Sequence, residues 1–215
     1  MHIFLVRHGE SMGNHGRNRI KRDPDHLLAL TDTGRKQSYE AGIFLANYCK
    51  ENNIDLEKAR IWRSPYRRTR ETCEEFNKSL NITDIKENIT LVEQQFGKVD
   101  SIPEKEWSLL YPDEYHEYAR QTQNQGKFYG RLPMGESPFD VAVRIQQFIY
   151  QIEKDYEKEG IDTIIVFTHG IALRTFLLRY FNYPPEWFEN EDNPKNCWIR
   201  EIKDGIDLGY INKDM

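Results

Sequence analysis

Short apolar runs alternate with amphipathic segments along the first part of the chain. Residues 2–6 form an apolar run typical of a buried strand, and residues 33–52 carry apolar side chains at helical spacing on one face. The same order recurs at residues 60–63, which predict a second strand, and from Ser64-Pro65, which has the form of a capped helix start. Alternation of strands and helices predicts a parallel sheet covered by helices.

The C-terminal part of the chain continues this alternation. We predict a helix over 137–159, a central strand over 163–167, a helix over 171–181, and edge strands over 197–202 and 208–211. The run at 163–167 is continuous and rich in β-branched residues, as expected of a strand buried on both faces. The predicted fold class is therefore α/β, a three-layer α/β/α sandwich with a mostly parallel central sheet.

An aromatic-rich excursion interrupts the pattern between about Gln94 and Glu136. Its large aromatic residues are Phe96, Trp107, Tyr111, Tyr115, Tyr118, Phe128 and Tyr129. We expect them to pack into a small inserted cap over a site, with some of them lining the substrate pocket. Because no repeat, low-complexity tract or linker divides the chain, we interpret residues 1–215 as a single domain with a cap insertion at about 94–136.

The composition excludes several classes of protein. With 38% hydrophobic and 30% charged residues among 215, the chain is neither disordered nor a collagen or a coiled coil. No apolar run approaches the roughly 20 residues that span a bilayer, and the first strand is followed at once by Arg7 and His8, unlike a signal peptide. We therefore expect a cytoplasmic protein that has no membrane partner.

Charge and cysteine content limit the kinds of partner and of structural site that we expect. A formal net charge of −5 argues against nucleic acid as the main partner, although a local basic pocket is compatible with it. Cys49, Cys73 and Cys197 lie far apart and are interpreted as packing residues rather than as a disulfide framework or a zinc site. Nothing in the sequence specifies the oligomeric state.

Cationic and imidazole side chains follow three of the predicted strands. Arg7-His8 follows the first strand, Arg67-Arg68 lies shortly after the second, and His169-Gly170 follows the strand at 163–167. Because ligands of open α/β sheets bind beyond the carboxyl ends of the strands, we expect these groups to share one edge of the sheet. Such a cluster of imidazoles and guanidiniums suits a phosphate group.

Over nearly its whole length the sequence resembles the histidine phosphatase superfamily, also called the phosphoglycerate mutase-like family. The motifs that carry the resemblance are Arg7-His8-Gly9-Glu10-Ser11 with Asn14, Leu30-Thr31-Asp32-Thr33-Gly34, Ser64-Pro65 with Arg68, Glu93 with Gly97, Pro133-Met134-Gly135-Glu136-Ser137, and His169-Gly170 with Arg174. Within the superfamily it looks most like the broad-range acid phosphatases of fungi and their bacterial relatives. That likeness rests on Pro24-Asp25-His26-Leu27, on residues 64–72, and on Phe128-Tyr129-Gly130-Arg131.

The resemblance implies a phosphoryl-transfer site, and the chemistry of the residues agrees with it. Arg7 and Arg68 would keep His8 uncharged, so that its imidazole could attack phosphorus. The same arginines and His169 would bind the phosphoryl oxygens. Glu93 stands where the family carries its general acid, and would protonate the leaving group and then deprotonate water. Loss of that proton would make kcat/KM fall on the alkaline side.

The remaining candidates are assigned weaker or structural roles. Asn14 and the amide of Gly170 are expected to add neutral donors to the phosphate. Glu10 is expected either to contact the pocket or to satisfy a backbone amide, and Thr31 to cap a helix or, less strongly, to contact the substrate. Arg174 is expected to form a structural ion pair.

No metal ligand or cofactor is expected. The other histidines, His2, His15, His26 and His116, lack the spacing of metal ligands. Arg67 and Arg70 are interpreted as solvated surface charges. The basic stretch of Arg17, Arg19, Lys21 and Arg22 is interpreted as a solvated face that could also steer anionic substrates.

The sequence therefore favours a metal-independent phosphomonoesterase that works through a phosphohistidine on His8. We expect a small phosphorylated metabolite as substrate and inorganic phosphate as product. The first alternative is a cofactor-dependent phosphoglycerate mutase, which in this family carries an adjacent arginine pair in the cap. Here the basic residues of the excursion are all separated: Lys98, Lys105, Arg120, Lys127 and Arg131. A non-catalytic phospholigand-binding protein is the second alternative.

Overall fold

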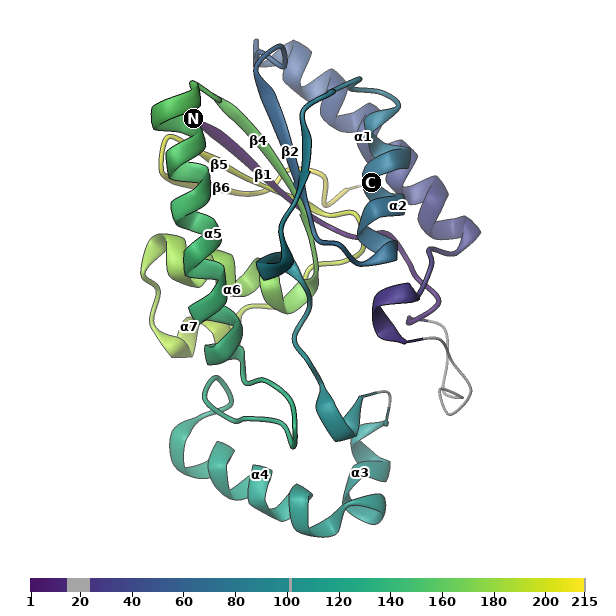
Figure 1. Cartoon of the computed structure of the whole chain (residues 1–215), viewed down its shortest axis with the longest axis vertical. Coiled ribbons are helices and arrows are strands. Elements are labelled where there is room, and N and C mark those ends of the chain that lie inside the picture. The colour runs from purple at the N-terminus through teal and green to yellow at the C-terminus, as the bar shows by residue number, and fades with distance from the viewer. Residues whose placement is uncertain (15–23, 101, 215) are drawn as a thin grey trace.

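The computed structural model describes residues 1–14, 24–100 and 102–214, and within them a six-stranded sheet lies between two layers of helices (Figure 1). The strands are β1 His2–Arg7, β2 Ala59–Arg63, β3 Ile85–Glu87, β4 Thr163–Thr168, β5 Ile199–Lys203 and β6 Ile206–Tyr210. Their order in the sheet is β3-β2-β4-β1-β5-β6. The predicted α/β sandwich with a mostly parallel sheet is confirmed.

The pairing of the strands brings three carboxyl ends to one edge of the sheet. β4 is parallel to both β1 and β2, with Arg7 opposite Thr168 and Arg63 opposite Phe167. β3 extends the parallel part, whereas β5 and β6 are antiparallel and form the other edge. The segments that follow β1, β2 and β4 therefore start side by side, as the sequence predicts.

Helices cover both faces because the central strands are buried on both sides. On one face lie α1 Asp32–Glu51 and α2 Arg67–Asn77; on the other lie α5 Pro138–Glu159, α6 Gly170–Phe181 and α7 Pro185–Asn190 (Figure 1). Side chains alternate along β1, so that Phe4 packs with the α1 and α2 face and Leu5 with the α5 and α6 face. Both of these side chains are fully buried.

Residues 94–136, here called the cap, lie beyond one end of the sandwich (Figure 1). The cap contains η4 Gly97–Val99, α3 Glu104–Leu110 and α4 Pro112–Gln125. Trp107 and neighbouring aromatics form a small core there, as the sequence predicts. Two of the aromatics expected in this core lie elsewhere: Phe128 packs with Ala142 of the sandwich, and Tyr129 is exposed.

Several element boundaries have local causes. The capping box at Ser137 and Asp140 starts α5, as predicted. The expected helix start at Ser64-Pro65 is wrong, since α2 begins at Arg67 and the Ser64 hydroxyl contacts His169 instead. β6 begins earlier than predicted, at Ile206, because the residues 204–205 have positive φ and form a two-residue hairpin turn.

The described residues also include two short 3-10 turns, η2 Asp25–Leu27 and η3 Ile89–Leu91. β3 and the two cap helices are elements that the sequence pattern did not predict. Among the helices of the described residues, none is both long and apolar enough to cross a bilayer.

Candidate active site

The carboxyl-terminal edge of the sheet carries the predicted histidines side by side. His8 follows β1 and His169 follows β4, and their ring centroids are 5.2 Å apart. A cavity of about 350 Å³ opens at this edge, and its walls include Arg7, His8, Asn14, Arg68 and Glu93. The structure therefore brings five of the predicted site residues to one hollow.

His8 is held in one tautomer by its own backbone. Its Nδ1 lies 2.7 Å from the carbonyl oxygen of Gly9, and because a carbonyl can only accept, Nδ1 carries the proton and Nε2 carries the lone pair. Burial lowers the pKa of His8 well below its ordinary value, and the charges of Arg68 and Arg7 lower it further. The imidazole is therefore neutral at physiological pH.

Gly9 allows the close approach that this geometry needs. A Cβ at that position would lie 2.6 Å from the carbonyl oxygen of Gly34. The surrounding backbone is anchored on both sides, since the Gly9 amide donates to Thr72 Oγ1 at 3.0 Å and the His8 carbonyl accepts from Asn196 Nδ2 at 2.9 Å. The His8 ring thus stands on a fixed backbone.

His169 lies behind this wall and is fully buried. Its Nε2 is 2.9 Å from the hydroxyl of Ser64, and its ring meets the Tyr66 ring edge-on at 5.1 Å. Burial lowers the pKa of His169 well below its ordinary value, helped by the nearby charge of Arg68. Among the described residues its Nδ1 has no hydrogen-bond partner.

The two arginines differ in their contacts. Arg7 donates to the carbonyl of Pro194, its Nε has no partner in the described part of the chain, and burial lowers its pKa. Arg68 directs both terminal nitrogens at the carboxylate of Asp25, each at 3.1 Å, and its guanidinium lies 4.8 Å from the centre of the Tyr66 ring. The Asp25 carboxylate therefore binds the two guanidinium nitrogens of Arg68 that are suited to bind a phosphate.

Glu93 lies at the amino-terminal end of α6. Its carboxylate accepts from the amides of Ile171 and Ala172, each at 3.3 Å, and from the amide of Gln94 at 3.0 Å. The N-terminus of a helix favours a negative charge at this place. A carboxyl group therefore faces the same cavity as His8 and the two arginines.

The loop that carries Glu93 is fastened to α5 through Arg144. This guanidinium donates to the carbonyls of Thr90, Val92 and Glu93, at 2.5, 2.8 and 3.1 Å, and pairs with Glu136 at 3.0 Å. Several carbonyls and one carboxylate thus converge on a single arginine. Arg144 lies in no motif that carries the family resemblance, although Glu136 does.

Comparison with known proteins agrees with this geometry. The family model of the histidine phosphatase superfamily (branch 1) matches residues 3–206. The chain belongs to the histidine phosphatase superfamily. Members of this superfamily are phosphatases or mutases, so membership supports an enzyme.

Individual relatives of this superfamily member include a phosphoglycerate mutase-like protein and an acid phosphatase. It is 30% identical to a phosphoglycerate mutase-like protein of Arabidopsis thaliana, over 94% of this chain and 65% of that protein, so it spans just under two thirds of that relative's length. It is 25% identical to a broad-range acid phosphatase of Saccharomyces cerevisiae, over 95% of this chain and 86% of that protein. The predicted likeness to the fungal acid phosphatases is confirmed, as the weaker of these two matches.

Solved structures share the fold at low sequence identity. The α-ribazole phosphatase of Shigella flexneri has a TM-score of 0.72 at 17% identity, covering 96% of this chain and 93% of that chain. A mycobacterial glucosyl-3-phosphoglycerate phosphatase in complex with inorganic phosphate has a TM-score of 0.69 at 16% identity, covering 94% and 89%. At these low identities the likeness shows that the chain shares the fold of these structures.

Four of the predicted site residues lie outside the cavity wall. His169 is buried behind the wall, and Gly170 opens α6 with the side chain of Asn193 packed against its Cα. Thr31 caps α1 by accepting from the Gly34 amide at 3.0 Å, and its hydroxyl donates to the carboxylate of Glu10 at 2.7 Å. Glu10 and Thr31 thus contact each other at the start of α1.

Three further predictions concern arginines. The expected ion pair of Arg174 is wrong, because its guanidinium donates to the Phe188 carbonyl and lies 3.9 Å from the centre of that ring. Arg67 and Arg70 are half-exposed and pair with Glu71 and Glu87, as surface charges do. The basic stretch of Arg17, Arg19, Lys21 and Arg22 lies outside the described residues, as does His15.

Three side chains in or near the cavity were missed as site residues. Asp25 and Asn193 line the cavity, and Ser64 contacts His169. Asp25 was part of a motif that carried the family resemblance, but no chemistry was assigned to it. Asn193 stands in a polar segment without periodicity, so no pattern pointed to it.

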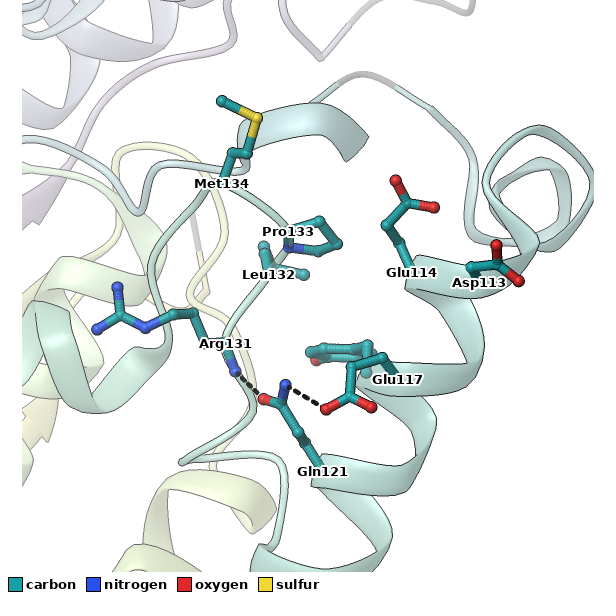
Figure 2. Close-up of a pocket in the computed structure, with 9 residues that line it drawn as sticks. Asp113, Glu114, Glu117, Gln121, Arg131, Leu132, Pro133 and Met134 are labelled. Atoms are coloured by element: carbon teal, nitrogen blue, oxygen red, sulfur yellow. Dashed lines mark hydrogen bonds between the residues drawn. The ribbon is translucent and has the colours of Figure 1, made fainter.

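The cap contains a separate, acidic cavity of about 400 Å³ (Figure 2). Asp113, Glu114 and Glu117 project into it from α4, opposite residues 131–134. Glu117 accepts from Gln121, whose own oxygen accepts from the backbone amide of Arg131. The described lining of this cavity has one arginine and no histidine, so the candidate active site is the cavity that holds His8, Arg7 and Arg68.

Proposed function

We propose that this histidine phosphatase superfamily member is a metal-independent phosphatase that hydrolyses phosphate monoesters through a phosphohistidine on His8. The observation that carries the proposal is the hydrogen bond from His8 Nδ1 to the Gly9 carbonyl, in a cavity walled by two arginines. That bond leaves the Nε2 lone pair as the nucleophile. The low pKa of His8 keeps this lone pair unprotonated.

In the first step Nε2 forms a bond to phosphorus while the bond from phosphorus to the ester oxygen breaks. The leaving oxygen takes that electron pair and receives a proton from the carboxyl of Glu93. In the second step the Glu93 carboxylate removes a proton from water, whose oxygen attacks phosphorus. The N–P bond breaks, its electrons return to Nε2, and inorganic phosphate leaves.

The positive charge that this transfer needs is present in the protein itself. Arg7 and Arg68 supply fixed cations beside His8, and Asn14 is the further donor in the cavity wall that we assign to the phosphoryl oxygens. His169 and the Gly170 amide lie outside that wall, so their contacts with the phosphate stay predictions from the sequence. Stabilisation of the transferring group is thereby assigned to side chains, without a metal ion or an organic cofactor. Turnover is accordingly expected to persist after dialysis against EDTA.

The decisive experiment is to trap the intermediate. Reaction of p-nitrophenyl phosphate with the Glu93→Gln variant should accumulate an acid-labile, alkali-stable phosphoenzyme, because a good leaving group needs no acid but water still needs a base. His8→Ala in the same background should abolish the adduct, whereas His116→Ala, an exposed histidine of the cap, should not. Formation of the adduct without His8 would overturn the assignment.

The mutase is the second candidate, supported by the mutase-like relative of Arabidopsis. A mutase of this family carries an adjacent arginine pair in the cap, whereas the basic residues of this cap are separated in the sequence and three of them pair with carboxylates. These pairs are Lys98 with Glu114, Arg120 with Glu117, and Arg131 with Asp140. The phosphatase is therefore favoured, and incubation with 3-phosphoglycerate should release phosphate rather than form 2-phosphoglycerate.

The third candidate, a non-catalytic phospholigand-binding protein, is disfavoured because His8, Glu93 and both arginines share one cavity. The single-domain organisation, the cytoplasmic location, and the absence of nucleic-acid and membrane partners stay predictions from the sequence.

A further inference from the structure

Another cavity, here called the second cavity and distinct from the acidic cavity of the cap, adjoins the one at His8 on the side of the cap. It has a volume of about 470 Å³, and Phe96, Val99 and Ile102 form part of the walls of both cavities. It lies between the cap and the sandwich, because α4 lines it on one side and Pro138 and Phe188 on the other. A group attached to a phosphate at His8 therefore has this second cavity as its neighbour.

The walls of the second cavity are mainly apolar and aromatic. Trp107, Tyr115 and Tyr118 contribute from the cap, and Phe188 contributes from α7. Of the described lining residues only Lys127 is charged, and it is exposed. A flat apolar group would bury its surface here favourably, whereas a chain of hydroxyls would lose water without enough partners in return.

Trp107 is a fixed part of this wall. It is only 6% exposed, and Tyr115 and Tyr118 hold its ring in place, at centroid distances of 5.6 and 5.0 Å.

We propose that the second cavity is the leaving-group subsite, and that the substrates are phosphate monoesters of aryl or arylalkyl alcohols. This inference rests on the proposed phosphatase function. Small polyhydroxylated esters, such as glycerol phosphates and phosphoglycerates, leave the subsite unfilled. The phosphate binds at His8, and the ring of the leaving group binds among the aromatic side chains.

Two esters with primary alkoxide leaving groups test the subsite. The value of kcat/KM for 2-phenylethyl phosphate should exceed that for glycerol 3-phosphate by roughly 10- to 100-fold, since one buried ring separates them. Comparable values for the two esters would overturn the proposal.

A cavity-filling variant locates the effect. Ala119→Phe places a ring inside the second cavity and should lower kcat/KM for 2-phenylethyl phosphate at least roughly 10-fold, while glycerol 3-phosphate is turned over as before. Gln123→Phe is the matched control, because Gln123 is exposed on the same helix and lies outside the cavity wall. Loss of turnover of both esters in Ala119→Phe, or of neither, would contradict the assignment.

The outcomes distinguish a failure of the subsite from a failure of the proposed phosphatase function. If no monoester releases phosphate, both the proposed function and the subsite are refuted. If glycerol 3-phosphate is hydrolysed as well as 2-phenylethyl phosphate, or if Ala119→Phe changes the turnover of neither ester, the phosphatase function stands and the subsite is refuted.

Discussion

Arg68 contacts Asp25 through the same two nitrogens that a phosphate would bind. The carboxylate lies 3.1 Å from each of them and is itself about 30% exposed. A partly exposed ion pair of this kind contributes about 1 kcal/mol, which corresponds to a factor of about five in an equilibrium constant. A phosphate that displaces Asp25 therefore binds about fivefold more weakly than it would bind to a free guanidinium.

We expect Asp25→Asn to strengthen the binding of inorganic phosphate about fivefold, because a neutral amide competes less well for the guanidinium and no longer repels the anion. Isothermal titration calorimetry at constant ionic strength measures this. Glu87→Gln is the control, since it removes a similarly exposed carboxylate from Arg70 on the same helix. Weaker phosphate binding by Asp25→Asn would mean that the carboxylate supports the site instead of competing for it.

The residues that follow strands could be predicted, whereas those supplied by loops could not. His8 and His169 are placed by strands whose apolar patterns are plain in the sequence, and the parallel register brings them together. Asp25 lies 43 positions before Arg68 in the sequence, and no local sequence pattern predicts that the loop of Asp25 contacts this arginine.

At the scale of elements, α5 supports the loop of the proposed general acid through one side chain. Arg144 is only 18% exposed and binds the carbonyls of Val92 and Glu93 together with the carboxylate of Glu136. A lysine at this position would keep the positive charge but would lack the planar guanidinium, so it could not bind the two carbonyls and the carboxylate simultaneously. Arg144 is thus a positioning residue for Glu93.

We expect Arg144→Lys to lower kcat/KM for 2-phenylethyl phosphate about 100-fold and for p-nitrophenyl phosphate less than about 10-fold, because kcat/KM reports the phosphorylation step, in which only the poor leaving group needs a well-placed acid. Steady-state kinetics on the two esters measures the ratio. Arg179→Lys, which alters a guanidinium bound to Gln146 on the neighbouring helix, should leave the ratio unchanged. An equal loss on both esters would indicate general damage rather than displacement of Glu93.

Elements with strong apolar periodicity were predictable, and those without it were not. α4 has no buried residue, so its sequence lacks the apolar stripe that reveals a helix. β3 has only three residues, at the edge of the sheet. The start of α2 was misplaced because the Ser64 hydroxyl serves His169 instead of a helix amide, a tertiary contact that overrides the local capping signal.

At the scale of the whole molecule, an acidic chain gathers two arginines at one end of its sheet. The formal net charge is −5, yet Arg7 and Arg68 line the cavity beside His8. The family, the fold and the cluster at the strand ends were all accessible from the sequence, because they depend on motifs and periodicity. The adjoining aromatic cavity was not, since it depends on how the cap packs against the sandwich.

The two buried histidines make folding stability depend on pH. The pKa values of His8 and His169 are both well below 6.5 in the folded chain, mainly through burial, whereas in the unfolded chain they are near 6.5. Below pH 6.5 the unfolded state therefore binds more protons than the folded state, so acid favours unfolding. Stability is retained above pH 6.5 and is lost as the pH falls, until the lowered folded-state pKa values are reached.

For two such groups the loss between pH 7.5 and pH 5.5 amounts to about 2–3 kcal/mol in the free energy of unfolding. Urea denaturation at both pH values measures it. His169→Asn removes one of the two groups, so it should halve the pH-dependent loss, whatever it does to stability at pH 7.5. His116→Gln, at an exposed position, should leave the full loss in place. A loss that His169→Asn leaves undiminished would show that other groups cause the acid sensitivity, and that His169 is not held neutral in the folded chain.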